Sequence, residues 1–197
     1  MDKGMPEYRL IRGRRKTIGI EIDPSGVLIV RAPRWVSKND IESFLVEKES
    51  WIKKHLSEMR QRVKEMEALI SELGPITGEE IKALADRMMK EFPPRVEEYA
   101  SKLGVNYGRV TIRVQRTRWG SCSAKGNLNF NCLLMLLPKE VQDYVIVHEL
   151  CHRKEMNHSA RFWELVGSVI PDYKKLRNTL REEGRIIMMR AFEAGDR

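Results

Sequence analysis

The 197-residue sequence has little cysteine, little histidine and no long apolar run, and these shortages exclude several classes of protein. Its three cysteines are an odd number without a Cys-x-x-Cys pair, which argues against a disulfide framework and predicts reduced thiols. No apolar run approaches the roughly 18 residues of a membrane-spanning helix. The first ten residues, MDKGMPEYRL, lack the apolar core of a secretory signal. We therefore expect a cytoplasmic protein without a membrane span.

A surplus of basic residues is the main bias in the composition. The chain has 36 lysines and arginines against 28 aspartates and glutamates, which gives a formal net charge of +8. The densest cluster is the Arg12–Lys16 run, RGRRK, which suggests contact with nucleic acid, nucleotide phosphates or acidic proteins. The alternative is a solvated strand or hairpin surface. We favour this alternative because no nucleic-acid motif or interleaved aromatic residue accompanies the charge.

The first half of the sequence predicts strands followed by long helices. Residues 8–32 partly alternate apolar with polar residues and contain the turn sequence DPSG, which indicates two or three strands. Helical periodicity follows, with suitable caps at Ser37, at Thr77 or Gly78, and at Gly104. Because proline breaks a helix, Pro93 and Pro94 are expected to separate the last two helices. The predicted helices cover residues 38–70, 79–92 and 95–103.

The second half predicts a small sheet and then more helices. Alternating segments indicate strands over residues 109–115, 116–123 and 127–137, with a hairpin turn at Gly126. A helix over residues 139–154 follows, and two shorter helices come after it. From residue 184 onward the periodicity is weak, so we expect the chain to fray there.

Three of the four histidines lie within the eleven residues from 148 to 158. On a helix, His148 and His152 project from one face, one turn apart, so that they can share one ion. Zinc prefers imidazole nitrogens in a tetrahedral shell, and an open shell with three protein ligands is typical of catalytic sites. His158 is the third ligand that this pattern predicts, with a turn in which Asn157 takes a left-handed conformation. The alternative interpretation is a group of structural histidines.

Glu149 lies about 100° around the helix from His148, beside the predicted ion rather than on it. A carboxylate in this position suits a general base that takes a proton from the attacking water. Strands followed by such a helix predict an α+β fold with a zincin-like catalytic layer, in which a short antiparallel or mixed sheet packs on the metal-bearing helix. An edge strand above the helix could bind an extended peptide.

We expect three parts in the chain. An N-terminal subdomain of strands and a helix covers residues 1–70, and a metal-dependent hydrolase domain covers residues 71–185. Residues 186–197 form a C-terminal tail.

Several separated motifs resemble the YgjP-like family of zinc metallopeptidases, which is related in motif to SprT-like and WLM peptidases. In chain order they are RWGSC at 118–122, Gly126, Asn131, HELCH at 148–152, His158 with Phe162 and Trp163, and PDY at 171–173. The resemblance covers nearly the whole chain. It implies a zinc-dependent hydrolase with metal ligands at His148, His152 and His158, one zinc ion per chain and Glu149 as the catalytic base.

Arg118 and Trp119 are candidate substrate-binding residues. Arg118 suits an oxyanion, or a phosphate or carboxylate of the substrate. Trp119 is either a pocket wall or a core anchor beside Gly120. Asn131 is a candidate for supporting a ligand histidine through a hydrogen bond.

Three functional hypotheses follow. The first is zinc-dependent hydrolysis of a peptide or protein substrate. The second is a metal-dependent phosphohydrolase acting on nucleoside triphosphates, although a histidine-rich shell favours zinc over the metals usual for phosphoryl transfer. The third is a nucleic-acid-associated protease whose basic surface binds DNA or RNA.

Overall fold

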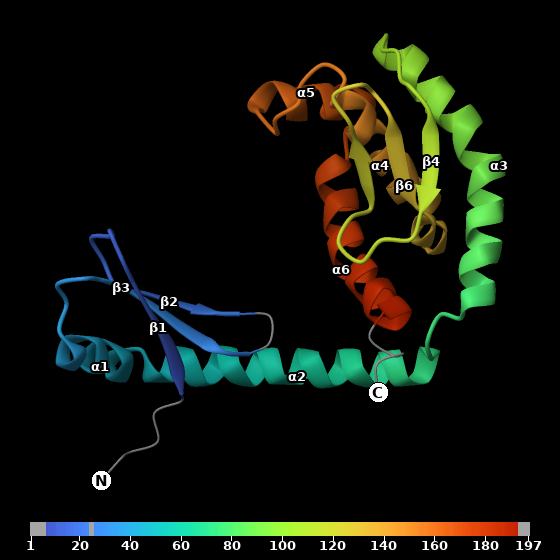
Figure 1. Ribbon diagram of the computed structural model, residues 1–197. Coiled ribbons are helices and arrows are strands. Elements are labelled where there is room, and N and C mark those ends of the chain that lie inside the picture. Colours follow the sequence, from blue (N-terminus) through green and yellow to red (C-terminus); the bar gives the residue numbers. More distant parts are fainter. Residues whose placement is uncertain (1–6, 24–25, 193–197) are drawn as a thin grey trace. The chain divides into compact units, whose positions relative to one another are not determined.

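A computed structural model describes residues 7–23 and 26–192, and the chain forms two compact units, residues 1–69 and 70–197. The protein is a mixed α+β protein with small sheets (Figure 1). Among the described residues, no helix is both long and apolar enough to span a membrane. The predicted division at residues 70 and 185, like cytoplasmic localisation, stays a prediction.

The first unit pairs a three-stranded sheet with two helices. Its strands are β1 (Tyr8–Gly13), β2 (Gly19–Ile22) and β3 (Leu28–Pro33), in the order β1-β3-β2. β3 is parallel to β1 and antiparallel to β2. Because β3 is central, its apolar side chains are buried, and they form one core with apolar residues of both helices.

The helices of this unit are α1 (Lys38–Glu47) and α2 (Glu49–Leu73), so the single helix predicted over residues 38–70 is wrong. Ser37 begins α1 with a capping box, as the sequence predicts. The chain leaves helical geometry at Lys48, where φ is −95° and ψ is 8°. The two segments bury side chains in the same core, from α1 Ile41 and Leu45, and from α2 Ile52 and Leu56.

The basic run Arg12–Lys16 contributes to this unit's own structure. Nη1 of Arg12 donates to the carbonyl oxygens of Pro33, Arg34 and Val36, at 3.1, 3.3 and 2.6 Å. This arginine therefore fixes the segment that follows β3. The contact agrees with a structural use of Arg12, and a nucleic-acid partner stays a prediction.

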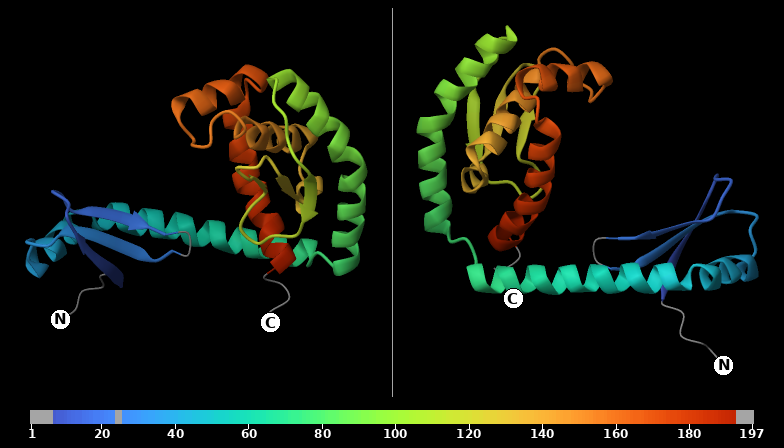
Figure 2. Two further views of the ribbon diagram at one scale, coloured as in Figure 1. Left: turned by 45° about the horizontal axis from the view of Figure 1, so that its top comes forward. Right: turned by 180° about the vertical axis from the view of Figure 1, so that it is seen from behind.

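In the second unit, α4 (Lys139–Cys151) is the central helix. The sheet of β4 (Val110–Arg113), β5 (Gly120–Cys122) and β6 (Leu128–Asn131) has the order β4-β6-β5. β6 is parallel to β4 and antiparallel to β5. The views in Figures 1 and 2 show α4 against one face of this sheet, with α3 (Gly78–Leu103) along one side and α6 (Tyr173–Phe192) along the other. α5 (Ala160–Val169) completes the unit.

α3 is one continuous helix, so the predicted break at Pro93 and Pro94 is wrong. Its ends agree with the sequence, with a capping box at Thr77 and a left-handed cap at Gly104, where φ is 61°. Prolines cost helical stability, and contacts just beyond them compensate. Arg95 donates to Asp143 Oδ1 at 2.9 Å and to Gln142 Oε1 at 2.7 Å, which holds this part of α3 on α4.

Two more expectations about the second unit are wrong. The predicted strand 127–137 ends at Asn131, and residues 132–136 form a 3₁₀ helix, η1 (Cys132–Leu136), because Asn131 accepts a bond from the Leu133 amide and caps it. The predicted fraying from residue 184 is also wrong within the described chain, because α6 continues to Phe192. Arg190 Nε donates to the Gly74 carbonyl at 2.8 Å, and Ile187 is buried, so packing fixes this segment.

Candidate active site

The candidate site is built on the C-terminal end of α4. Nine of the thirteen residues of this helix are buried, so its apolar pattern surrounds the helix rather than marking one face. The helix ends at Cys151, three residues earlier than predicted, and His152 is its C-cap residue with φ −63° and ψ −13°. His148 and His152 therefore still lie one turn apart on the same side.

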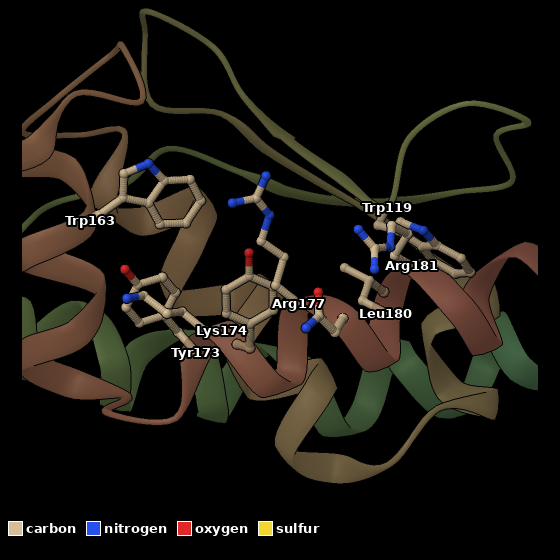
Figure 3. Close-up of a pocket in the computed structure, with 9 residues that line it drawn as sticks. Trp119, Trp163, Tyr173, Lys174, Arg177, Leu180 and Arg181 are labelled. Carbon is tan, nitrogen blue, oxygen red and sulfur yellow. The ribbon is translucent and has the colours of Figure 1, made fainter. Parts of the chain in front are cut away.

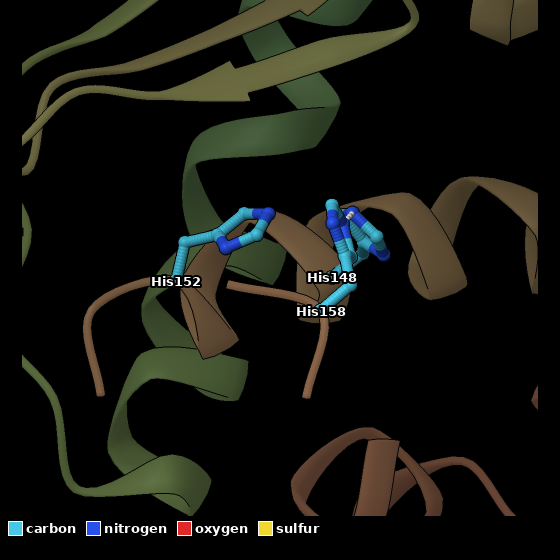
Figure 4. Close-up of side chains that lie close together, drawn as sticks. All are labelled: His148, His152 and His158. Atoms are coloured by element: carbon cyan, nitrogen blue, oxygen red, sulfur yellow. Dashed lines mark hydrogen bonds between the residues drawn. The ribbon is translucent and has the colours of Figure 1, made fainter. Parts of the chain in front are cut away.

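The structure brings together the three histidines that the sequence singles out. The nearest ligand nitrogens of His148, His152 and His158 all lie within 4.8 Å of one another. Figure 4 shows His148 and His158 close together, with the ring of His152 turned toward them. The Nε2 atoms of His148 and His158 are 3.1 Å apart. Two nitrogens on one tetrahedral zinc would lie roughly 3.3 Å apart, given bonds of about 2.0–2.1 Å. The donor set fits a zinc ion.

The turn between His152 and His158 differs from the prediction. Among the described residues other than glycine, none has a positive φ, so Asn157 is not left-handed. The chain turns instead through hydrogen bonds from the Glu155 amide to the Cys151 carbonyl, at 3.0 Å, and from the Ser159 amide to the Asn157 carbonyl, at 2.8 Å. Ser159 then caps α5.

Neighbouring groups orient the imidazoles. Nδ1 of His152 lies 3.1 Å from the Glu155 carbonyl oxygen, which can only accept, so this nitrogen carries the proton and Nε2 keeps its lone pair. Phe162 is buried beneath the cluster, and its ring centroid is 4.9, 4.6 and 4.7 Å from those of His148, His152 and His158. Nδ1 of His148 is buried without a hydrogen-bond partner.

Burial keeps the imidazoles of His148 and His152 neutral. The pKa of His148 is lowered to about 3, mainly by burial and to a smaller extent by the charges of His152, His158 and Arg177. Burial also lowers the pKa of His152. Neutral imidazoles with free lone pairs are the form that binds a cation.

Glu149 lies beside the cluster, buried, with its carboxyl group against β5. Burial raises the pKa of Glu149 to about 8, and the opposite charge of Arg118 acts to lower it. The three histidines, Glu149 and Arg118 all line one cavity of about 280 Å³. It is lined by Arg118, Gly120, Ser121, Cys122, His148, Glu149, His152, Met156 and His158.

The other sequence candidates lie elsewhere. Trp119 lines a second cavity, of about 750 Å³, and packs on α6 at Gly184, where a Cβ would lie 2.7 Å from Trp119 Cζ2. Trp119 thus packs at Gly184 rather than beside Gly120 and does not line the cavity of the histidines, and its role in substrate binding stays a prediction. Asn131 does not support a ligand histidine, because its Nδ2 donates to the carbonyl oxygens of Gln115, at 2.7 Å, and Arg118, at 3.0 Å. It holds the loop that carries Arg118.

The cationic residues of the second cavity, Lys174, Arg177 and Arg181 on α6, are not among the site residues predicted from the sequence. Their spacing of three and four residues places them on one helix face, which is a readable pattern. What the sequence does not reveal is that this face adjoins the histidine cluster.

Three imidazoles around one point with a buried carboxylate beside them are typical of a metal-dependent hydrolase. Comparison with known families agrees. The family described as YgjP-like, metallopeptidase domain, matches residues 16–86 and 79–183. The chain belongs to this family, which makes it a metal-dependent hydrolase and supports a peptidase.

Two solved structures resemble part of the chain. One is the crystal structure of the metallopeptidase zymogen of Pyrococcus abyssi abylysin, with 26% identity, a TM-score of 0.43, and coverage of 46% of this chain and 91% of that one. The other is the metallopeptidase zymogen of Methanocaldococcus jannaschii jannalysin, with 21% identity, a TM-score of 0.43, and coverage of 48% and 97%. A search of curated proteins gave no significant match.

Proposed function

We propose that the chain hydrolyses peptide bonds with one zinc ion held by His148, His152 and His158, and with Glu149 as general base. The observation that carries this proposal is the convergence of three ligand nitrogens within 4.8 Å beside a buried carboxyl group. The three nitrogens leave room for the open position of a catalytic shell. A bound zinc ion supplies Lewis-acid polarisation and makes water more acidic.

Glu149 moves the proton. Its carboxylate takes a proton from water as the water oxygen attacks the peptide carbonyl carbon. As the carbon–nitrogen bond breaks, the same carboxyl group delivers the proton to the leaving amine. Burial supports this role, because it raises the pKa of Glu149 above that of an exposed carboxyl group, and a general base works best when its pKa is near the working pH.

The substrate is proposed to bind along β5. In the described sheet this strand pairs only with β6, so its other edge keeps free backbone donors and acceptors. An extended peptide can add to such an edge as a further strand, next to Glu149. A peptide that pairs with the edge strand beside the metal-bearing helix is the arrangement expected of a zincin-like layer. Arg118 lines the same cavity and is placed to stabilise the negative charge that develops on the carbonyl oxygen.

The test is peptide hydrolysis by the zinc-reconstituted protein. Wild type should cleave casein or a mixed peptide library, and a chelator should abolish cleavage. Glu149→Gln keeps the shape of the side chain and should lower kcat by about 100-fold or more without loss of zinc. The matched control is Glu164→Gln, an exposed glutamate outside this cavity, which should retain full activity. Full activity of Glu149→Gln would remove Glu149 from the mechanism.

Two other hypotheses remain predictions. A nucleoside triphosphate phosphohydrolase would hydrolyse nucleotides and leave peptides intact. A nucleic-acid-associated protease would bind DNA or RNA with an affinity that falls steeply with salt.

A further inference from the structure

A second cavity, of about 750 Å³, adjoins the histidine cluster. The two share an aromatic wall. Tyr144 and Trp163 line the cavity, and both ring centroids lie 5.9 Å from that of His148. Trp163 also stacks on His158, with centroids 5.6 Å apart. A substrate group next to the bond being cleaved can therefore enter this cavity.

The polar side of the cavity is cationic. Its lining includes Lys174, Arg177, Asn178 and Arg181, which share one face of α6, and contains no acidic residue. Arg177 makes no hydrogen bond or ion pair with any other described residue; its guanidinium lies 4.9 Å from the centre of the Trp163 ring. Among the described residues, the one ion-pair partner of Arg181 is the exposed Glu182, at 3.8 Å. The cavity therefore carries positive charge that no acidic residue of its lining neutralises.

A row of cations on an exposed helix is usually a solvated surface, but here rigid aromatic groups surround it. Trp163 stacks on Tyr173, with centroids 5.3 Å apart and planes at 13°. At the other end Trp119 is fixed against α6 at Gly184. Figure 3 shows Trp163 and Trp119 at opposite ends, with Arg177 between them. This combination suits a ligand with an apolar stem and an anionic end.

We propose that this cavity, which we call the α6 pocket, binds an acidic side chain of the peptide substrate at a position next to the scissile bond. The guanidinium of Arg177 matches a carboxylate in a planar, bidentate manner, while the aromatic walls contact the methylene groups of glutamate or aspartate. The inference rests on the proposed function, because the α6 pocket selects a peptide for cleavage only if the histidine cluster cleaves one.

A nucleoside triphosphate also offers an aromatic group and negative charge. A peptide is favoured over a nucleotide as the ligand, because the chain belongs to a family of metallopeptidase domains. Nucleotide binding is therefore the competing outcome of the test.

The first experiment measures kcat/KM for short end-blocked peptides that differ only by glutamate or glutamine at one position near the cut. Wild type should prefer glutamate by about tenfold at one position. Arg177→Gln should reduce that preference to about twofold or less, and Arg177→Glu should shift it toward lysine. Lys175→Gln is the matched control, because Lys175 is exposed on α6 and lies outside the pocket. An unchanged preference in Arg177→Gln would overturn the proposal.

The second experiment measures binding without cleavage. The glutamate and glutamine peptides are titrated into Glu149→Gln protein by calorimetry, with and without the Arg177→Gln change. Tighter binding of the glutamate peptide that depends on Arg177 would support the α6 pocket. Equal binding of both peptides, or binding of a nucleoside triphosphate but of neither peptide, would overturn it. Failure of wild type to cleave any peptide contradicts the proposed function instead, and the binding result then decides the pocket alone.

Discussion

The backbone of Gly120 lies directly against the carboxyl group of Glu149. A Cβ at position 120 would lie 2.7 Å from Oε1 and 2.8 Å from Cγ of Glu149, closer than side chains approach in real structures. The backbone at Gly120 does not have a positive φ, so glycine is needed here for space and not for conformation. β5 thereby sets the position of the carboxyl group.

The first prediction concerns this contact. Gly120→Ala should displace the Glu149 carboxylate and lower kcat for peptide hydrolysis by about tenfold or more, because small misplacement of a catalytic group is costly. Zinc content should not change, since the three histidines are untouched. Gly78→Ala is the control, because a Cβ there meets nothing within 4 Å. A Gly120→Ala protein with wild-type kcat would contradict the role given to this contact.

The second prediction concerns the pH dependence of stability in metal-free protein. Burial raises the pKa of Glu149 from 4.5 to about 8, so the folded state binds a proton that the unfolded chain releases above about pH 4.5. This contribution to stability is fully present below pH 4.5 and is lost as the pH rises to about 8. Glutamine does not titrate, so Glu149→Gln avoids this loss and should be the more stable protein at pH 8, by about 4 kcal/mol, and no more stable at pH 4.5.

The measurement is chemical denaturation of both proteins in the presence of a chelator across this pH range. A difference in the free energy of unfolding that stays constant with pH would show that Glu149 titrates normally.

The third prediction concerns the junction of α3 with α4. Arg95 and Asp143 form a salt bridge with side chains only 13% and 17% exposed. Arg95→Ala should lower the free energy of unfolding by about 2–3 kcal/mol, because it leaves the Asp143 carboxylate without its partner. Lys102→Ala removes an exposed pair with Glu98 on the same helix and should have little effect. Equal effects of the two changes would mean that Arg95 does not hold α3 to α4.

The helix caps could be predicted from the sequence because each depends on a few residues that are adjacent in the chain. The caps at Ser37, Thr77 and Gly104 follow from local chemistry, and all three occur. The break expected at Pro93 does not occur, because Arg95 reaches residues of α4 that lie more than 40 positions away. The low helix propensity of proline is outweighed here by contacts between α3 and α4, which a single sequence does not reveal.

The candidate site follows the same rule. His148 and His152 are predictable because helical spacing alone brings them together, and the structure places His158 beside them. The α6 pocket is not predictable in this way. It joins Arg177 to Trp119, two residues far apart in the sequence whose proximity depends on how α6 packs on α4 and η1.

The zinc content of purified, reconstituted protein, measured by mass spectrometry, tests whether the three histidines form a metal site. We expect about one zinc per chain in wild type, and loss of it in His148→Ala, His152→Ala and His158→Ala. His55→Ala is the matched control, because it removes the one histidine outside the cluster and should leave zinc content unchanged. Zinc that survives all three cluster substitutions, or a wild-type protein that binds none, would contradict the central claim.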